Sequence, residues 1–372
     1  MPYLNVRQVE SALLAAARPP NHSFTELITL PNPTWEGRTC RALKIAKGSD
    51  SERMGVYFIG GVHAREWGSP DILIYFIQRL TRAYRTNSDL TLGSRNFTAA
   101  QIQNIVDNLD VFIFPQVNPD GRNYSMTGDP NWRKNRRPAS SSNPDCLGVD
   151  INRNYDFLWN YPTYFHPEAP VRNSTDPCDY QVYIGPSAAS EPETQNVVSM
   201  LDSHPNIRLF VDVHSYGESI LYGWGDDQEQ VTNPNMNFQN VAFNGQRGIA
   251  DDDAYREYID DPDQAFAIDL ANRMQDAIRA VQGRTYEVKS SFELYPTAGT
   301  STDYTFSRHL ADASNGKVYS YTIEWGSRQN ATPFHPPYSE MQNIIREVTA
   351  GLLDSCLSII ELTQVSAPST IE

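Results

Sequence analysis

The chain has 372 residues, a formal net charge of −15 at pH 7 and a hydrophobic content of 40%. That content is enough for a substantial core and argues against disorder, while the negative charge argues against a general binder of nucleic acid or anionic membranes. No apolar run approaches the length that spans a bilayer. We therefore expect a folded monomer with no nucleic-acid or membrane partner.

The N-terminus and the cysteines leave the compartment open. The first residues lack a basic start followed by an apolar segment, so the given sequence shows no secretory signal. The protein is then either cytoplasmic or secreted with its leader removed. Cys146 and Cys178 flank a loop-rich segment and are candidates for one disulfide, although four separate thiols, with Cys40 and Cys356, also fit the sequence.

The first third of the chain alternates between the two kinds of regular structure. Helices are predicted over residues 5–18, 70–84 and 98–108, and strands over residues 39–47, 54–59 and 111–115. A polar turn between the first two strands suggests a hairpin. Strands interleaved with helices indicate an α/β domain with a mostly parallel sheet.

The rest of the chain begins with an irregular stretch over residues 118–190, whose aromatic residues and cysteines indicate an ordered, functional segment. Ser190 and Glu193 match a capping box at the start of a helix, with Pro192 at an early helical position. Strands are then predicted over residues 207–214 and 317–324, helices over 264–281 and 338–362, and an acidic surface excursion over 226–261. Gly351 is the point where the last helix could break.

These elements predict a fold of one α/β domain, in which a central mixed, mostly parallel, twisted sheet of about eight strands has helices on both faces. We assign residues 1–362 to one catalytic domain and residues 363–372 to a frayed tail, and we expect no pro-domain.

A candidate metal site follows the strand over residues 54–59. His63 and Glu66 lie three positions apart, just beyond two glycines that allow the chain to turn. Imidazole and carboxylate both suit Zn²⁺, and a catalytic zinc often takes two histidines and one glutamate. The HxxE motif alone is weak, because a surface turn with a solvated Arg–Glu pair gives the same pattern.

Two further strands end in residues that suit the same site. His214 ends one apolar strand and Glu324 ends another. In open α/β sheets, sites form outside the carboxyl ends of strands, so His214 could meet His63 there. Taken singly, His214 is more simply a core or rim histidine and Glu324 a rim charge.

Seven motifs then occur in an order that resembles the zinc metallocarboxypeptidases similar to carboxypeptidase A, over about residues 3–362. They are His63-Ala64-Arg65-Glu66-Trp67, Asn118-Pro119-Asp120-Gly121, Trp132-Arg133-Lys134, Asp150-Ile151-Asn152-Arg153-Asn154, His214-Ser215-Tyr216, Leu294-Tyr295-Pro296 and Ile323-Glu324. Seven ordered motifs are far more specific than HxxE alone.

The resemblance implies a role for each reacting group. His63, Glu66 and His214 would bind one Zn²⁺ per chain and leave the fourth position for water, whose pKa a catalytic zinc lowers to about 7. Glu324 would be the general base. Arg133 would polarise the scissile carbonyl and stabilise the oxyanion.

The resemblance also implies the residues that bind substrate. Asn152, Arg153 and Tyr295 would hold the free C-terminal carboxylate of a peptide, which is what makes an exopeptidase. In the family, the loop that carries this tyrosine is a mobile lid, although a flexible surface turn has the same composition. The other implied contacts are Arg65, Ser215 and Tyr216 with the substrate, Asp150 with the ring of His63, and Cys178 with Cys146 as a disulfide.

Specificity is implied by the position at the base of the family's side-chain pocket, which is Thr302 here. This neutral residue, with Leu221, Gly225 and Thr322, favours apolar or aromatic C-terminal residues. Three acidic residues near these positions would give mixed specificity if one reached the pocket: Asp226, Asp227 and Asp303.

We therefore predict a zinc-dependent enzyme that hydrolyses the C-terminal peptide bond of peptides or proteins. Two alternatives are a non-catalytic, zinc-dependent peptide-binding module and a related zinc amidase acting on small acyl-amino acids or cell-wall peptides. A non-catalytic module usually lacks the base or a metal ligand. A zinc amidase would show an altered lid or altered carboxylate-binding residues (the clamp, here Asn152, Arg153 and Tyr295).

Overall fold

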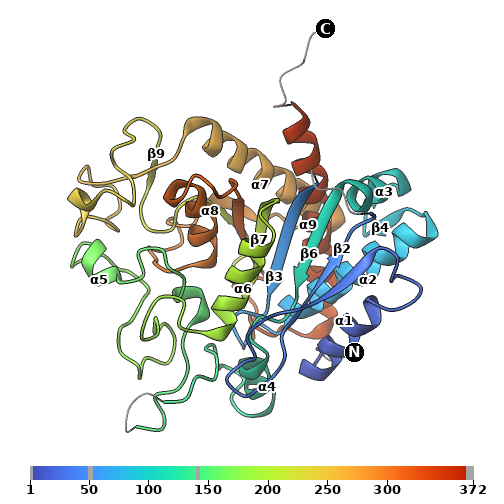
Figure 1. The fold of residues 1–372 in the computed structure, drawn as a ribbon, viewed down its shortest axis with the longest axis horizontal. Helices are drawn as coiled ribbons and strands as arrows, with labels where there is room; N and C mark the ends of the chain where they lie inside the picture. The colour runs from blue at the N-terminus through green and yellow to red at the C-terminus, as the bar shows by residue number, and fades with distance from the viewer. Residues whose placement is uncertain (1–2, 49–52, 140–142, 366–372) are drawn as a thin grey trace.

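A mixed eight-stranded sheet crosses the centre of the computed structural model, which describes residues 3–48, 53–139 and 143–365 (Figure 1). The strand order is β1-β2-β6-β3-β7-β12-β8-β11. The strands are β1 (Thr25–Thr29), β2 (Arg41–Ile45), β3 (Met54–Gly60), β6 (Leu109–Phe114), β7 (Ile207–Ser215), β8 (Ser219–Tyr222), β11 (Glu287–Ser290) and β12 (Tyr319–Trp325). Among the described residues, four of its seven strand pairs are parallel. The predicted mixed α/β sheet is confirmed.

Helices cover both faces of the sheet, as predicted. One face packs against α1 (Val6–Ala16), α2 (Gly68–Thr86), α3 (Ala99–Asn108), α7 (Asp261–Gln282) and α9 (Tyr338–Val365). The other face packs against α6 (Pro192–Ser203) and α8 (Ser301–Ala311). The shorter elements are β4 (Leu90–Leu92), β5 (Arg95–Phe97), α4 (Pro119–Thr127), η1 (Ile151–Arg153), α5 (Tyr161–Tyr164), β9 (Glu229–Gln230), η2 (Val241–Phe243) and β10 (Glu257–Tyr258).

Strand alternation decides which side chains reach the α6 side of the sheet. On β7, Val211 and Val213 join the core under α2 and α9, so Asp212 and His214 point to the opposite face. On β12, Ile323 enters that same core, which sends its neighbour Glu324 to the opposite face. The central strands are apolar because helices bury both faces, and their few polar residues are concentrated toward α6 and α8.

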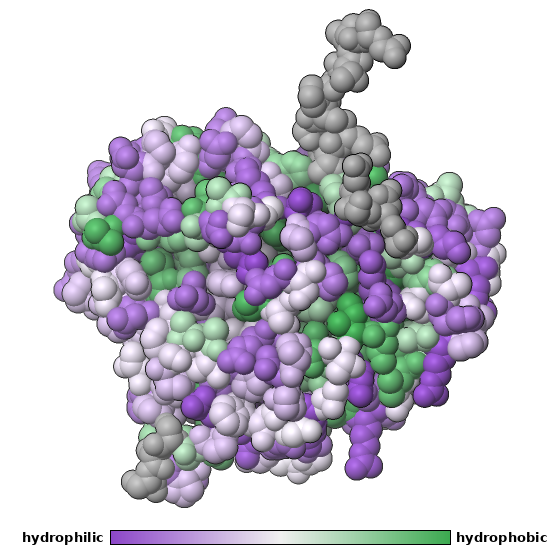
Figure 2. Space-filling model, viewed as in Figure 1, coloured by the Kyte–Doolittle hydropathy of each residue, from purple (hydrophilic) through white to green (hydrophobic). Residues whose placement is uncertain are grey.

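The visible surface is mainly hydrophilic (Figure 2). Hydrophilic residues dominate the face shown in Figure 2, with apolar side chains in smaller groups between them. Within the described ranges, no helix combines the length and the apolarity needed to cross a bilayer.

The predicted hairpin between the strands near residues 39–47 and 54–59 is wrong. β6 lies between β2 and β3, and β2 instead pairs antiparallel with β1, which the sequence analysis missed. A strand pattern gives the apolar face but not the neighbour, and the fully buried β6 takes the central place.

The predicted capping box at Ser190 is also wrong. The helix begins one residue later, with Glu191 as its N-cap, and Ser190 Oγ donates to Glu191 Oε1 at 2.6 Å instead of capping the helix. Pro192 does occupy the first turn, as predicted. The last helix runs through Gly351 without a break, and a Cβ built there would lie 3.1 Å from Ile278 of α7, so the glycine allows close packing of the two helices.

Other boundaries differ from the predictions. The structure adds α4 within the irregular stretch, and β8, β11 and α8, which are short or lack a strong apolar pattern. The segment over residues 226–261 is not simply a surface excursion, since Asp226, Arg247 and Glu257 are fully buried in it. Helix α9 continues to Val365, so residues 363–365 are helical, and residues 366–372 lie outside the described part of the chain.

Candidate active site

The three predicted metal ligands converge at the carboxyl ends of two neighbouring strands. After β3, Gly61 takes a φ of +66°, which turns the chain toward His63 and Glu66, and His214 arrives at the end of β7. The backbone N–H of Ala64 donates to the carbonyl of Arg133 at 3.0 Å, which ties this turn to the Arg133 segment. Residues that are 151 positions apart therefore share one centre.

The ligand atoms of this group lie within 4.8 Å of one another. His63 Nδ1 is 2.8 Å from Glu66 Oε1 and 3.0 Å from His214 Nδ1, while His214 Nδ1 is 3.1 Å from Glu66 Oε2. All three side chains are buried. Two imidazole nitrogens and a carboxylate facing one point form a donor set that fits Zn²⁺.

Each histidine has a carboxylate at its other ring nitrogen. His63 Nε2 lies 3.1 Å from Asp150 Oδ1, and His214 Nε2 lies 2.8 Å from Asp212 Oδ2. Ser301 Oγ donates to the same Asp212 oxygen at 2.7 Å. Such partners leave both Nδ1 atoms for the metal and orient the rings. Burial alone would raise the pKa of Asp150, but Arg133 and His63 outweigh it and hold that pKa well below its usual range.

The two glutamates of the site have opposite pKa shifts. Burial raises the pKa of Glu66, yet His63 and His214 outweigh it and lower the net value, which keeps Glu66 ionised as a ligand. Burial, helped by Glu66, raises the pKa of Glu324 to about 7 against the opposing effect of His214. Glu324 pairs with His214 across β7 and β12, so the register places it beside the ligands. One carboxylate suits metal binding and the other suits proton transfer.

A cavity of about 540 Å³ opens over this centre. Its lining includes four hydrogen-bond donors that make no hydrogen bond with a described residue: Arg133 Nη1, Asn152 Nδ2, Arg153 Nη2 and the hydroxyl of Tyr295. Two of these side chains are held in place, because Asn152 Oδ1 accepts from the Ser301 N–H and Arg153 Nε donates to the carbonyl of Arg172. The cavity therefore offers held donors to an anionic or carbonyl oxygen.

The remaining predicted substrate contacts line the same cavity. The guanidinium of Arg65 stacks 4.0 Å above the ring of Phe334, and the ring of Tyr216 lies 4.9 Å from Phe334. The backbone N–H of Ser215 donates to Glu66 Oε2 at 3.1 Å. The predicted base, oxyanion donor, carboxylate-binding residues and the ligands His63 and Glu66 line this cavity too, whereas the ligand His214 is buried behind it.

Thr302 lines a smaller extension of about 40 Å³ beyond Asn152, Arg153 and Tyr295. Leu221 and Thr322 line it too, as expected. The lining does not include Gly225 or the three acidic residues that sequence proximity suggested. Asp303 accepts from the Gly225 N–H at 3.0 Å, Asp227 from the Gly248 N–H at 2.6 Å, and Asp226 lies near Arg247, so all three carboxylates serve the surrounding loops.

The sequence is also similar to a known protein family and to individual known proteins. The model of the family described as zinc carboxypeptidase matches residues 12–351. The chain is 31% identical over 294 residues to carboxypeptidase B of Astacus astacus, covering 78% of this chain and 76% of that protein. This chain belongs to the zinc carboxypeptidase family.

Another curated relative is similar in sequence, and two solved structures have a similar fold. Carboxypeptidase O of Bos taurus is 29% identical over 335 residues, which cover 89% of this chain and 72% of that protein. The fold resembles bovine thrombin-activatable fibrinolysis inhibitor in complex with tick carboxypeptidase inhibitor, with a TM-score of 0.72 at 20% identity, covering 97% of this chain and 98% of that one. Carboxypeptidase A from Helicoverpa armigera gives the same TM-score at 22% identity, covering 97% and 75% of the two chains.

The zinc carboxypeptidase site also contains residues that sequence reasoning missed. Asp212 carries a readable signal, since it lies two positions before His214 and strand alternation puts both on one face. Arg172, Arg328 and Phe334 line the cavity from irregular segments, where no periodic pattern marks them.

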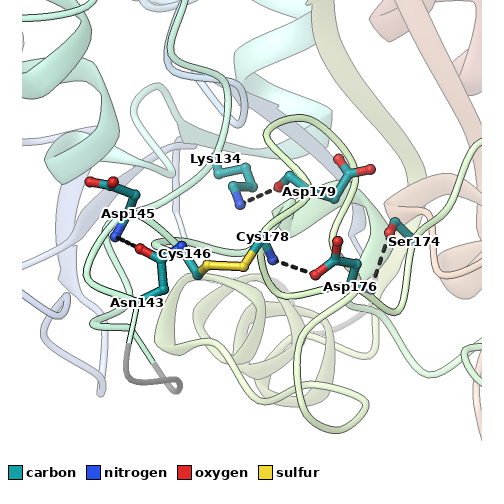
Figure 3. Close-up of a disulfide and its surroundings, with 8 residues drawn as sticks. All are labelled: Lys134, Asn143, Asp145, Cys146, Ser174, Asp176, Cys178 and Asp179. Atoms are coloured by element: carbon teal, nitrogen blue, oxygen red, sulfur yellow. Dashed lines mark hydrogen bonds between the residues drawn. A yellow bond between two sulfur atoms is a disulfide. The ribbon is translucent and has the colours of Figure 1, made fainter.

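One wall of the cavity is held by a disulfide. Cys146 and Cys178 are bonded, with Cα atoms 4.2 Å apart, and Lys134 Nζ donates to the Asp179 carbonyl at 2.5 Å beside them (Figure 3). Cys146 precedes the Asn152–Arg153 clamp and Cys178 precedes Gln181, which also lines the cavity. The bond thus joins two segments that border the site, and the cysteine pairing implied by the family resemblance agrees with the structure.

Proposed function

We propose that this protein is a zinc-dependent exopeptidase that removes the C-terminal residue of peptides, with a preference for neutral, apolar residues. One observation carries the proposal. The His63, Glu66 and His214 group, the raised-pKa carboxyl of Glu324 and four free donors all border a single cavity. A peptide bond and a free carboxylate can therefore be held together beside a proton acceptor.

The residues that would hold the zinc are His63 and His214 through Nδ1 and Glu66 through its carboxylate. When bound there, zinc supplies Lewis-acid polarisation and lowers the pKa of water. Asp150 and Asp212 keep the two rings oriented for that ion.

The chain's own residues supply the remaining steps. The Glu324 carboxylate lines the cavity and makes no hydrogen bond with a described residue, so it is free to take a proton from the attacking water and deliver it to the nitrogen of the leaving amino acid. Arg133 Nη1 donates to the carbonyl oxygen as its negative charge develops. Asn152, Arg153 and Tyr295 bind the substrate carboxylate, which positions the last peptide bond and excludes internal bonds.

The preference for apolar residues follows from the extension of the cavity. Leu221, Thr302 and Thr322 are neutral, and no aspartate lines the extension. The carboxylate in its lining belongs to Glu324, the proposed base, so a C-terminal lysine or arginine would bury its charge beside Arg153 with no carboxylate reserved for it. The extension is small and is bordered by Leu294 and Tyr295, so a large aromatic ring has to displace that loop.

The disulfide supports an oxidising compartment. Structural disulfides persist in secreted and extracellular proteins and are rare in the cytosol. Cys146 and Cys178 form such a bond within the described chain. We therefore favour secretion over a cytoplasmic location. The test is to purify the protein from its source under non-reducing, alkylating conditions and to count its free thiols. Four free thiols would contradict it.

Hydrolysis of blocked dipeptides that differ only in their last residue tests the proposal. We expect turnover of C-terminal leucine and valine, at least about tenfold slower turnover of lysine and arginine, and loss of all turnover with a chelator and its recovery with Zn²⁺. Thr302→Asp should shift the preference toward lysine, since it adds a carboxylate to the extension. Turnover that resists chelation, or the absence of hydrolysis with zinc, would contradict the proposed activity.

A further inference from the structure

The charges that line the cavity are opposite to the charge of the protein. The chain carries a net charge of −15. Yet the described lining of the cavity contains five arginines and two glutamates, and it includes no aspartate or lysine. The arginines are Arg65, Arg133, Arg153, Arg172 and Arg328. The two glutamates are the metal ligand Glu66 and the base Glu324, so neither is available to neutralise them.

The proposed reaction accounts for only part of this positive charge. Arg133 is neutralised by Asp150 at 2.8 Å and serves the scissile carbonyl, and Arg153 serves the terminal carboxylate. Arg328 has no such task. Its side chain is exposed, and it makes no hydrogen bond or ion pair with a described residue.

The position of Arg328 separates it from the C-terminal side of the substrate. Asn152, Arg153, Leu294, Tyr295 and Glu324 line both the main cavity and its extension. Arg328 lines the main cavity only. It therefore lies on the part of the cavity that receives residues upstream of the scissile bond.

Local packing keeps Arg328 close to the reacting groups. The Gly217 N–H donates to the Gly326 carbonyl at 3.0 Å, which attaches the turn after β12 to the turn after β7. A Cβ built on Gly217 would lie 3.6 Å from Arg328 Nη2 and 3.6 Å from Glu324 Cβ. The guanidinium thus lies over a glycine that leaves it accessible, beside the base.

Arg65 adds positive charge to the same cavity. It stacks on Phe334, and its only polar contact is a hydrogen bond of 3.4 Å to the carbonyl of Asn131, so it has no ion pair among the described residues. Two arginines without acidic partners among the described residues, both lining the main cavity and neither lining the extension, form a site for an anionic side chain.

We propose that Arg328, together with Arg65, makes this enzyme prefer peptides with an acidic side chain one or two residues upstream of the bond it cleaves. The proposal rests on the proposed exopeptidase function and adds to it the class of peptide that the cavity selects. The ionised carboxylate of a substrate glutamate or aspartate would accept hydrogen bonds from the guanidinium of Arg328.

The test compares matched peptides in which glutamate replaces its neutral isostere. Blocked tripeptides ending in leucine carry Glu or Gln either directly before the cleaved bond or one residue earlier. We expect kcat/KM for the Glu peptide to exceed that for the Gln peptide about two- to fivefold at one of these positions, the range of an exposed charge pair. The ratio should fall as salt is added, because salt screens exposed charges.

Variants assign the effect to Arg328. Arg328→Gln should bring the Glu-to-Gln ratio to about one, Arg328→Glu should bring it below one, and Arg328→Lys should keep it above one. Arg346→Gln is the matched control, because Arg346 is exposed on α9 and does not line the cavity. Each ratio compares two substrates of one protein sample, so a difference in folded fraction cancels.

The outcomes separate the inference from the proposed function. Ratios of one or less at both positions in the unmodified protein overturn the inference, as does an unchanged ratio in Arg328→Gln, while hydrolysis of the Gln peptide still upholds the exopeptidase. Failure to hydrolyse either peptide in the presence of zinc overturns the proposed function, and the inference falls with it.

Discussion

At the scale of single residues, two neighbouring carboxyl groups of the site have opposite pKa shifts and therefore suit different roles. Glu66 is kept ionised by two histidines, whereas burial raises the pKa of Glu324 to about 7. Glu66 is buried and Glu324 is half-buried, and both line one cavity, so the opposite directions of their pKa shifts come mainly from their partners. A ligand needs a stable charge and a base needs to change its charge near neutral pH.

Glu324→Gln is expected to lower kcat by about 10²–10⁴, because the amide cannot accept and return a proton. Zinc content should stay at one per chain, since Glu324 is not among the grouped ligands. Metal analysis and turnover of a blocked dipeptide measure both quantities. Glu168→Gln, at an exposed position, is the control and should match the unmodified protein. Full turnover in Glu324→Gln would refute its role as the base.

Asp212→Asn is expected to weaken zinc binding about 10- to 100-fold, because the neutral amide orients and polarises the ring of His214 less well. Competition with a chromogenic chelator gives the dissociation constant without any assay of activity. Asp269→Asn, exposed on α7, should leave that constant unchanged. Equal zinc affinity of the two variants would assign Asp212 a purely structural task.

At the scale of elements, the first turn of α6 buries two acidic side chains beside the Asn135 segment. Glu193 is fully buried, and Asn135 donates to its Oε2 at 2.9 Å while Oε1 has no partner. Burial, together with the nearby charges of Glu191 and Asp120, raises the pKa of Glu193 to about 8 despite that hydrogen bond. The helix therefore begins with a carboxyl group that is protonated at neutral pH.

This shift makes stability depend on pH in a definite direction. A carboxyl group whose folded pKa is raised from 4.5 to about 8 stabilises the fold fully below pH 4.5 and loses that contribution as the pH rises to about 8. Glu193→Gln, which resembles the protonated acid, should raise the melting temperature at pH 8.5 and change it little at pH 5. The difference in unfolding free energy should grow by about 1.4 kcal/mol per pH unit over this interval. Thermal scans at several pH values measure it, and a pH-independent difference would contradict the shift.

Much of the element pattern could be predicted from the sequence, because long buried elements carry long apolar patterns. β3, β6 and β7 were predicted for this reason, and so were α2 and α7. Short elements such as β8 and β11 have too few residues to show a period. Pairing was not predictable, because apolar alternation says which face is buried but not which strand lies next to it.

Some residues of the candidate site could be predicted from the sequence and others could not. His63, Glu66, His214 and Glu324 follow apolar strands or the turns after them, so their positions are marked in the sequence. Arg328 follows β12 within an irregular turn, and only the folded chain shows that it reaches the cavity. The acidic residues near Thr302 misled the sequence argument, since proximity along the chain does not say where a carboxylate points.

At the scale of the whole molecule, one covalent bond supports a large irregular region around the site. The bond between Cys146 and Cys178 spans 32 residues, and that span includes the clamp residues Asn152 and Arg153. Only η1 and α5 are regular helices within this span of described residues, and the bond restricts the conformations that the span can adopt in the unfolded chain.

Replacing both Cys146 and Cys178 with serine is expected to cost about 3–4 kcal/mol of unfolding free energy, the chain-entropy value for a loop of this length. Urea unfolding with and without reductant measures the effect. Reductant should destabilise the unmodified protein and leave the double variant unchanged, while Cys40 and Cys356 are buried free thiols in both. Equal sensitivity to reductant would show that the bond does not form.

The pairing of Glu324 with His214 across two central strands links catalysis to the integrity of the entire sheet. A slip of one residue would turn Glu324 away from the cavity, and both strands are covered by helices that resist such a slip. On gradual heating, activity should thus persist until cooperative unfolding, without an earlier phase of inactivation in which the protein is still folded.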